Sequence, residues 1–260
     1  MRSLQFFELR PFAVASNNRR GAMIISHAHK FIFIKTAKTA GTSIEVFLSQ
    51  QCGPNDVITP ITPPVGGHQA RNHAGFVNPI PEVRQGRQRL IPALRHMFTD
   101  RKFHAHMPAT LVQQRIPTRI WNSYFKFCVE RNPWDKVLSH YHMHAHRAGG
   151  SLSLDQYLAK GKFPINYYRY TNPSGTRIIV DRVVRYENLL NDLAEVFARV
   201  GVIFDGTLGV RAKSEYRSDR TPYQEVFNED QRQQVARAFA REIALHGYRF
   251  ERAAPTGTSL

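Results

Sequence analysis

A loop of small and cationic residues, KTAGTS, occupies positions 38 to 43 and follows an expected strand at 31–35, whose first four residues are apolar. Helix-forming residues come next, so the loop joins an expected strand to an expected helix from Thr42 to about Gln50. The first N–H groups of a helix have no partner within the helix and carry partial positive charge. The hydroxyls of Thr42 and Ser43 and the ammonium of Lys38 stand beside them, so the pattern indicates a phosphate site.

The residue order of this loop differs from two better-known phosphate loops. In a Walker A loop the lysine follows the last glycine, whereas here Lys38 precedes Gly41. A dinucleotide fingerprint would place Gly-x-Gly-x-x-Gly after the strand, and this sequence has no such pattern there. The loop therefore favours a single phosphate gripped by the helix N-terminus, with Lys38 reaching across it to a neighbouring group.

A second strand, loop and helix follow about 90 residues later, in VERNPWDKVLSHY at Val129 to Tyr141. Aromatic and β-branched residues predict a buried strand at 124–130. Asn132 followed by Pro133 is typical of a helix start, and that helix should run to about Arg147. A guanidinium offers paired donors to phosphate oxygens, and a hydroxyl on the adjoining helix can complete such a grip.

Together the two segments resemble the donor-binding elements of sulfotransferases that use 3′-phosphoadenosine 5′-phosphosulfate (PAPS). The resemblance implies that the 5′-phosphate is held by Thr39, Ala40, Gly41, Thr42 and Ser43. It implies that Arg131 and Ser139 share the 3′-phosphate. Two positions depart from the family pattern, since Ala37 stands where proline is more frequent and Glu130 where an apolar or small residue is expected.

Further segments, RYENLL at 185–190 and REIALHGYRF at 241–250, are similar to carbohydrate-type sulfotransferases of the Golgi and bacterial kind. Sulfuryl transfer needs a cation at the leaving oxygen and a base at the acceptor. The resemblance assigns Lys38 to the first role. It assigns His106, and second His104, to the second role, because glycan 2-O-sulfotransferases have a His-x-His pair in a similar place. Arg217 falls where related enzymes bring a late basic loop over the nucleotide.

No metal is expected at this site. His140 with His144, and His142 with His146, are spaced as i,i+4 pairs on the helix that begins at Pro133. Neither a HExxH pattern nor a cysteine ligand accompanies them, so a solvated or phosphate-facing helix surface is the preferred interpretation.

The order of elements predicts the α/β class: a P-loop-like three-layer fold whose central, mostly parallel sheet has helices on both faces. Residues 1–26 form an expected N-terminal extension, 27–252 one sulfotransferase-like domain and 253–260 a tail. Seven prolines between 53 and 102 predict a long insertion within that domain. The other expected elements are helices at 108–115, 153–159, 187–200 and 228–247 and a strand at 177–186.

Net charge and cysteine content indicate which partners and which cellular compartment the sequence favours. The chain has 36 Lys and Arg against 20 Asp and Glu, a net charge of +16, which favours polyanionic partners. Cys52 and Cys128 match no metal or redox spacing, which favours a reducing compartment, and we expect a soluble, cytoplasmic protein. No apolar run is long enough for a membrane span. Nothing in the sequence indicates an oligomeric state.

The sequence thus predicts a PAPS-dependent enzyme that moves a sulfuryl group to a hydroxyl on a glycan, a glycolipid or a small molecule. PAPS is the co-substrate, and no nucleic acid is expected as a partner. Two alternatives remain open. The first is a non-catalytic basic protein that binds nucleotides or nucleic acid, and the second is a degenerate sulfotransferase fold that binds without turnover. A P-loop kinase is disfavoured by the reversed order of Lys38 and Gly41.

Overall fold

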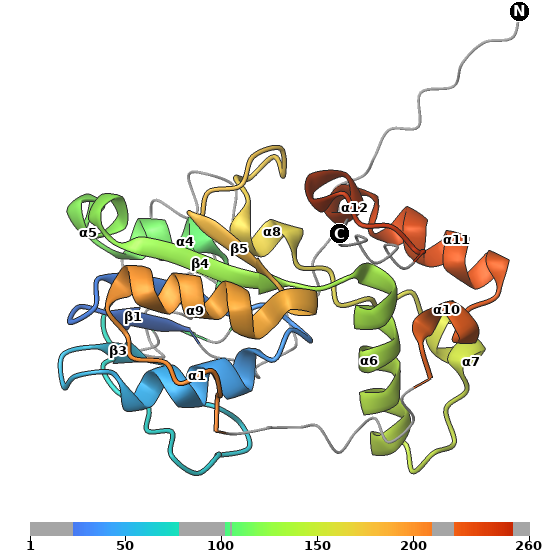
Figure 1. The fold of residues 1–260 in the computed structure, drawn as a ribbon, viewed down its shortest axis with the longest axis horizontal. Coiled ribbons are helices and arrows are strands. Elements are labelled where there is room, and N and C mark those ends of the chain that lie inside the picture. The colour runs from blue at the N-terminus through green and yellow to red at the C-terminus, as the bar shows by residue number, and fades with distance from the viewer. Residues whose placement is uncertain (1–22, 78–101, 105, 210–220, 252–260) are drawn as a thin grey trace, which may run out of the picture.

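The computed structural model describes residues 23–77, 102–104, 106–209 and 221–251 (Figure 1). Its sheet has the strand order β3-β1-β2-β4-β5. β1 pairs antiparallel with both β2 and β3, whereas β2, β4 and β5 pair in parallel. Within the described ranges, four of the five strands therefore point the same way, which confirms the mostly parallel sheet. The strands are β1 (Ile24–Ser26), β2 (Phe31–Ile34), β3 (Val57–Ile58), β4 (Phe125–Glu130) and β5 (Arg182–Arg185).

Helices cover both faces of the sheet, as expected (Figure 1). Successive residues of a strand point to opposite faces, so Phe31 and Phe33 pack on one side and Ile32 and Ile34 on the other. The first side is covered by α1 (Gly41–Gln50) and α9 (Leu189–Val200). The other side is covered by α4 (Ala109–Arg115), α5 (Thr118–Ser123) and α8 (Tyr167–Tyr170). The three-layer α/β class is therefore confirmed.

A separate helical cluster stands at the carboxyl end of β4. In Figure 1, α6 (Pro133–Arg147) runs away from the sheet, with α10 (Tyr223–Val226) and α7 (Leu154–Ala159) beside it. α11 (Glu229–Ala238) and α12 (Ala240–His246) complete the cluster, whose core includes Trp134, Leu138 and Phe239. α6 begins as the sequence predicts, because the Asn132 side chain accepts a hydrogen bond from the Trp134 N–H at 3.1 Å. This helix carries the second predicted phosphate element.

Two strands lie in segments that the sequence assigned to the periphery. Residues 24–26, expected in the N-terminal extension, are fully buried in β1, so the sheet begins before residue 27. Val57 and Ile58, expected in the proline-rich insertion, form the edge strand β3. Runs of two or three apolar residues are too short for a periodicity to identify them, and pairing with β1 decides their conformation. Within that insertion, residues 78–101 are outside the described residues.

Two expected elements are broken in the structure. The strand expected at 177–186 is reduced to β5, because Ile178 instead bridges Thr171 and the Ile179 N–H donates to the Tyr170 carbonyl at 2.9 Å. The helix expected at 228–247 divides at Phe239, whose φ of −108° and ψ of 21° depart from helical values. The Phe239 side chain is fully buried, so packing against α6 and α7 overrides local helix propensity there.

Asp56 holds the turn between β1 and β2 against the edge of the sheet. Its carboxylate accepts hydrogen bonds from the Ser26 hydroxyl at 2.9 Å and from the backbone N–H groups of His27 and Gly53 at 2.6 and 2.9 Å. Burial would raise the pKa of Asp56, but these donors outweigh it, so the pKa lies below its usual value. The ionised carboxylate therefore stabilises the fold above the unfolded-state pKa of about 4, and this stabilisation is lost as pH falls through the folded-state pKa.

We expect Asp56→Asn to lower the free energy of unfolding by about 1–3 kcal/mol at pH 7, because an amide cannot accept from all these donors. The difference from the wild type should be smaller at pH 3 than at pH 7, because the stabilisation from ionised Asp56 begins to be lost below the unfolded-state pKa of about 4. Urea unfolding at both pH values tests this, with the exposed Asp230→Asn as the matched control. An unchanged difference at low pH would contradict the role of the ionised carboxylate.

Candidate functional site

The KTAGTS loop lies at the carboxyl end of β2 and has an unusual backbone. Lys38 and Ala40 have positive φ values of 64° and 57°, and helix α1 begins at Gly41, one residue earlier than expected. Ala40 occupies the N-cap position and makes no side-chain hydrogen bond to the helix. The residue before α1 therefore gives its first turn no side-chain cap, which suits a helix start that binds an anion.

The interior of the loop is fixed by two threonines. The hydroxyls of Thr36 and Thr39 lie 2.8 Å apart, and the Thr36 hydroxyl donates to the Val129 carbonyl of β4. Thr39 is only 1% exposed, so its side chain is used inside the loop. Any contact of Thr39 with a phosphate would therefore come from its backbone.

Asn166 holds the loop from outside. Its side-chain oxygen accepts a hydrogen bond from the Ala37 N–H at 2.9 Å, and its amide donates to the Ala37 carbonyl at 3.1 Å. Asn166 is fully buried, and its backbone N–H donates to Glu242 of α12 at 2.9 Å. The conformation of the loop is thereby tied to the helical cluster.

Arg131 joins the two predicted phosphate elements. One guanidinium nitrogen, Nη1, donates to the Lys38 carbonyl at 3.3 Å. Nε and Nη2 lie 2.8 and 2.7 Å from the same Asp135 oxygen, and the guanidinium stacks 4.0 Å from the centre of the Tyr186 ring. Two segments 93 residues apart thus meet at one point. Asp135 and Tyr186 hold the guanidinium in place.

Ser139 is half-buried on α6, four residues after Asp135. Residues four apart on a helix share a face, so Ser139 lies one turn beyond the carboxylate that holds Arg131. Shared binding of one phosphate by Arg131 and Ser139 stays a prediction.

Glu130 does not direct its charge toward this site. Its side chain is fully buried, and Oε1 accepts hydrogen bonds from Lys136 Nζ at 2.7 Å and from the Arg131 N–H at 2.9 Å. Oε2 accepts from the Tyr170 hydroxyl at 2.9 Å. The negative charge of Glu130, which departs from the expected pattern, is thus paired with the positive charge of the buried Lys136 near the start of α6.

His106 lies against the end of β2. Its Nδ1 is 3.2 Å from the Lys35 carbonyl, and its own carbonyl accepts a hydrogen bond from Arg169. Because a carbonyl can only accept, Nδ1 carries the proton, and in the neutral ring Nε2 has the lone pair that a base needs. His104 is half-buried two residues earlier. The roles of both histidines remain predictions, and Arg217 lies outside the described residues.

Two of the four histidines of α6, His140 and His144, form a packed pair, whereas His146 is exposed. His140 Nδ1 lies 2.7 Å from the Tyr157 hydroxyl, and His140 Nε2 lies 3.2 Å from His144 Nε2. Burial is the main reason that the pKa of His140 is lowered to about 3, and the charges of His144, Lys38 and Arg147 contribute to the same shift. Lys38 is therefore near enough to α6 to act on this pair. Across the described ranges, no group of three or more His, Cys, Asp or Glu residues could hold a metal ion.

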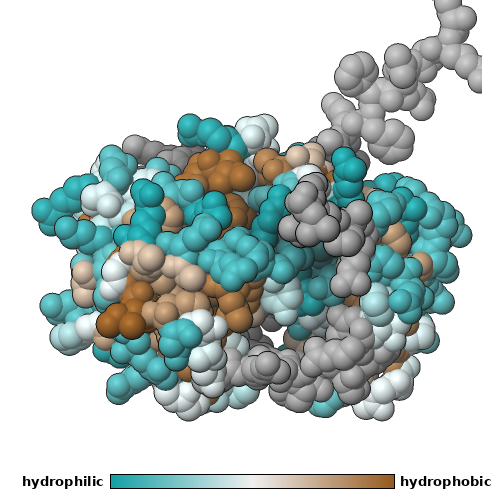
Figure 2. Space-filling model, in the orientation of Figure 1, coloured by the Kyte–Doolittle hydropathy of each residue, from teal (hydrophilic) through white to brown (hydrophobic). Residues whose placement is uncertain are grey.

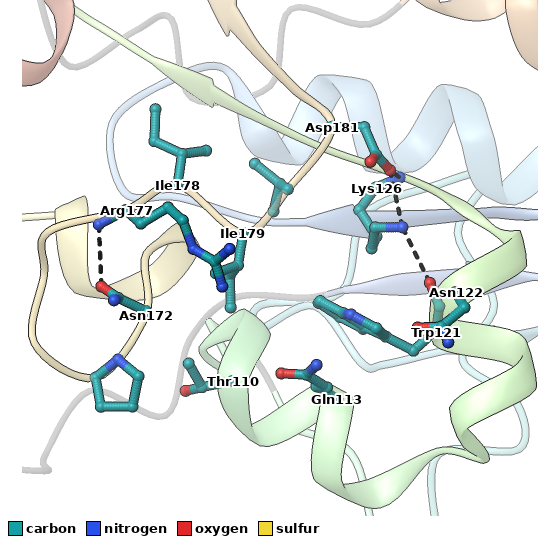
Figure 3. Close-up of a pocket in the computed structure, with 12 residues that line it drawn as sticks. Thr110, Gln113, Trp121, Asn122, Lys126, Asn172, Arg177, Ile178, Ile179 and Asp181 are labelled. Carbon is teal, nitrogen blue, oxygen red and sulfur yellow. Dashed lines mark hydrogen bonds and ion pairs between the residues drawn. The ribbon is translucent and has the colours of Figure 1, made fainter.

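A cleft of about 490 Å³ lies at the opposite end of the parallel strands (Figure 3). Lys126 at the start of β4 forms an ion pair of 2.9 Å with Asp181, and Figure 3 shows Arg177 beside Asn172 across the cleft. Arg131 and the KTAGTS loop lie at the carboxyl ends of the strands instead. In open α/β sheets ligands bind at those ends. The cleft is therefore separate from the candidate site.

Few of the described residues expose a large apolar side chain. Figure 2 shows a face that is largely hydrophilic, with hydrophobic patches between the polar residues. Among the described residues, the large apolar side chains that stand exposed are Phe76, Leu190 and Ile203. In this part of the chain, no helix has both the length and the apolar character needed to cross a membrane.

Four residues around the site were not identified from the sequence. Asn166, Asp135 and Tyr186 hold the loop and Arg131, and Lys35 lies under the helix start. Only Asp135 had a local signal, because its spacing of four from Arg131 across the start of α6 permits an ion pair. Asn166 and Tyr186 act through contacts between distant parts of the chain, whereas Lys35 contacts Thr42 only seven positions later.

Sequence comparison finds a relative whose activity is not stated. No family model matches the sequence. Over 117 residues the chain is 32% identical to an uncharacterized protein of Archaeoglobus fulgidus, a match that covers 98% of that protein and 43% of this chain. The chain belongs to the same family as that protein.

Among solved structures, the chain is similar to a sulfotransferase from Alicyclobacillus acidocaldarius. The two are 18% identical, and the match covers 84% of this chain and 95% of that one, with a TM-score of 0.39. A likeness at this level carries no argument about activity, so the functional case depends on the site itself.

Proposed function

We propose that this protein is a sulfotransferase that uses PAPS as donor and a hydroxyl group as acceptor. The observation that carries the proposal is the contact between Arg131 Nη1 and the Lys38 carbonyl at 3.3 Å. It joins a helix start suited to one phosphate to a guanidinium suited to another. A nucleotide with phosphates on both the 5′ and the 3′ positions of its ribose matches that pairing, whereas ATP has no 3′-phosphate.

The proposed chemistry is an in-line displacement at sulfur. The acceptor oxygen forms a bond to sulfur while the bond from sulfur to the bridging oxygen of the 5′-phosphate breaks, which leaves 3′-phosphoadenosine 5′-phosphate (PAP). Lys38 stabilises the charge on the leaving oxygen, and His106 Nε2 takes the acceptor's proton. The first turn of α1 holds the 5′-phosphate, and Arg131 with Ser139 holds the 3′-phosphate. The transfer itself needs no metal, and Arg217 is proposed as a further nucleotide contact.

The acceptor is proposed to be a carbohydrate or glycoconjugate, in keeping with the segments that resemble carbohydrate sulfotransferases. The net charge of +16 would favour an anionic glycan, but it serves the anionic donor equally well. A cytoplasmic location follows only from the cysteine content and also stays a proposal. The competing function is binding of nucleotide or nucleic acid without turnover.

Calorimetric titration of the wild type with PAP, AMP and ATP tests the donor site. We expect micromolar binding of PAP that is at least about tenfold tighter than binding of AMP, because a charge-assisted contact to the 3′-phosphate contributes on the order of 1.4 kcal/mol or more. Arg131→Ala should remove this preference, whereas Arg182→Ala, an exposed arginine on β5, should keep it. Equal, weak binding of all three nucleotides would contradict the proposal.

Turnover is then measured with sulfur-labelled PAPS and a panel of acceptors: desulfated heparin, a galactolipid and a simple phenol. Formation of a labelled product that is lost in a Lys38 variant would support catalytic sulfuryl transfer. Binding of PAP that depends on its 3′-phosphate, without transfer to any acceptor or to water, would favour the non-catalytic alternative.

A further inference from the structure

A second lysine lies beneath the phosphate loop. Lys35 directly follows β2 and is only 4% exposed. Its ammonium donates hydrogen bonds to the Thr42 hydroxyl at 3.1 Å and to Glu45 Oε2 at 2.9 Å. Thr42 and Glu45 both belong to α1, one in its first turn and the other a turn later. Lys35 therefore connects the end of the strand to the start of the helix.

The chemistry of this contact fixes the direction of the Thr42 hydroxyl. An ammonium group can only donate hydrogen bonds, so the Thr42 oxygen is the acceptor. The hydroxyl hydrogen must then point away from Lys35. Thr42 is the second residue of α1, so this hydroxyl lies beside the first-turn N–H groups, which also donate. A threonine held in this way is a donor for an anion at the helix start.

Packing holds Lys35 in this position. A Cβ atom added to Gly41 would lie 2.8 Å from Lys35 Cγ, so glycine at 41 allows the lysine stem to pass against the helix start. Glu45 is fully buried and supplies the opposite charge. His68, from the segment after β3, lies 3.3 Å from the other Glu45 oxygen. The Lys35 ammonium is therefore paired with the Glu45 carboxylate while it donates to the Thr42 hydroxyl.

We propose that Lys35 is a positioning residue for donor recognition, which orients the Thr42 hydroxyl as a donor to the 5′-phosphate. The inference rests on the proposed function and adds to it a residue outside the KTAGTS loop. Lys35 itself does not touch the nucleotide. Its effect should therefore depend on Thr42 and on the presence of a 5′-phosphate.

The test compares PAP with adenosine 3′-monophosphate, which lacks the 5′-phosphate, by calorimetric titration. Loss of a charge-assisted hydrogen bond leads us to expect that Lys35→Met weakens PAP binding about tenfold. Binding of adenosine 3′-monophosphate should change less than about twofold, since its remaining phosphate contacts Arg131. In a Thr42→Val background, Lys35→Met should produce little further loss of PAP affinity. A merely structural role would weaken both ligands and would add to the effect of Thr42→Val.

A buried Glu45 without its partner could unfold the single variant, so Lys35→Met/Glu45→Gln is measured as well, because it removes both charges together. The exposed Lys162→Met is the matched control. A folded double variant with wild-type affinity for PAP would overturn the role of Lys35 alone. Failure of the wild type to bind PAP would overturn the proposed function and this inference with it.

Discussion

Lys38→Ala is expected to lower sulfuryl transfer from PAPS by a factor of about 10² to 10³, the usual cost of removing a group that stabilises charge in the transition state. Lys38 lies between the end of β2 and the first turn of α1, and its carbonyl already contacts the guanidinium expected to hold the 3′-phosphate. The leaving bridging oxygen gains charge only during the reaction. PAP affinity should therefore fall much less than turnover, by about tenfold or less.

The comparison is made with labelled PAPS, by following PAP formation with water or with an acceptor from the panel, alongside titration with PAP. Alanine keeps the Cβ atom, so the substitution does not change the strain at the φ of 64°. The exposed Lys162→Ala is the matched control for loss of one positive charge. Parallel losses of PAP affinity and of turnover would assign Lys38 to donor binding only and would contradict its role at the leaving oxygen.

The parts of the fold that carry the site were predictable because their signals are local. The apolar run before Lys38 predicts β2, and Asn132 followed by Pro133 predicts the start of α6, where Asn132 caps the helix as expected. Such patterns depend on neighbours within about one helical turn. The sequence therefore indicated the two phosphate elements and their order along the chain.

The residues that hold these elements together could not be predicted in the same way. Asn166 contacts Ala37 across 129 positions, and Tyr186 stacks on Arg131 from the end of β5. No periodicity or spacing encodes contacts of that kind, because they arise only when the sheet brings the strand ends together. Glu130 illustrates the same limit. Its place next to Arg131 in the sequence implies a charge directed away from the phosphate, but only the fold identifies its partner, the buried Lys136.

Lys136→Met is expected to be the most destabilising of the substitutions considered, with a loss of about 3–5 kcal/mol at pH 7, the usual cost of leaving a buried charge without its partner. Lys136 is fully buried, and its ammonium lies 2.7 Å from Glu130 and 3.4 Å from Glu242. Both carboxylates are fully buried as well. Without the lysine, two acidic groups would face each other with no cation between them.

The pH dependence of this loss follows from Glu242. Burial raises the pKa of Glu242, the attraction of Lys136 opposes that rise, and repulsion from Glu130 adds to it. Removing Lys136 should therefore raise the pKa further. A carboxyl group whose folded-state pKa is raised binds its proton more tightly in the folded state, so its contribution to stability is full below the unfolded-state pKa and is lost as pH rises through the folded-state pKa. Lys136→Met should accordingly recover part of its stability, relative to the wild type, between pH 8 and pH 5.

Urea unfolding of Lys136→Met and of the exposed Lys162→Met across that pH range tests the argument. The control should follow the wild type at every pH. If the loss of unfolding free energy in Lys136→Met does not change with pH, the argument is contradicted. Glu130 and Glu242 would then be neutral or hydrated even when the lysine is present. Asn166 forms hydrogen bonds with Glu242, with Glu130 and with the Ala37 backbone. The same residue therefore contacts both the buried acidic groups around Lys136 and the phosphate loop. For that reason PAP binding by Lys136→Met should weaken in the same pH range in which its stability is lowest.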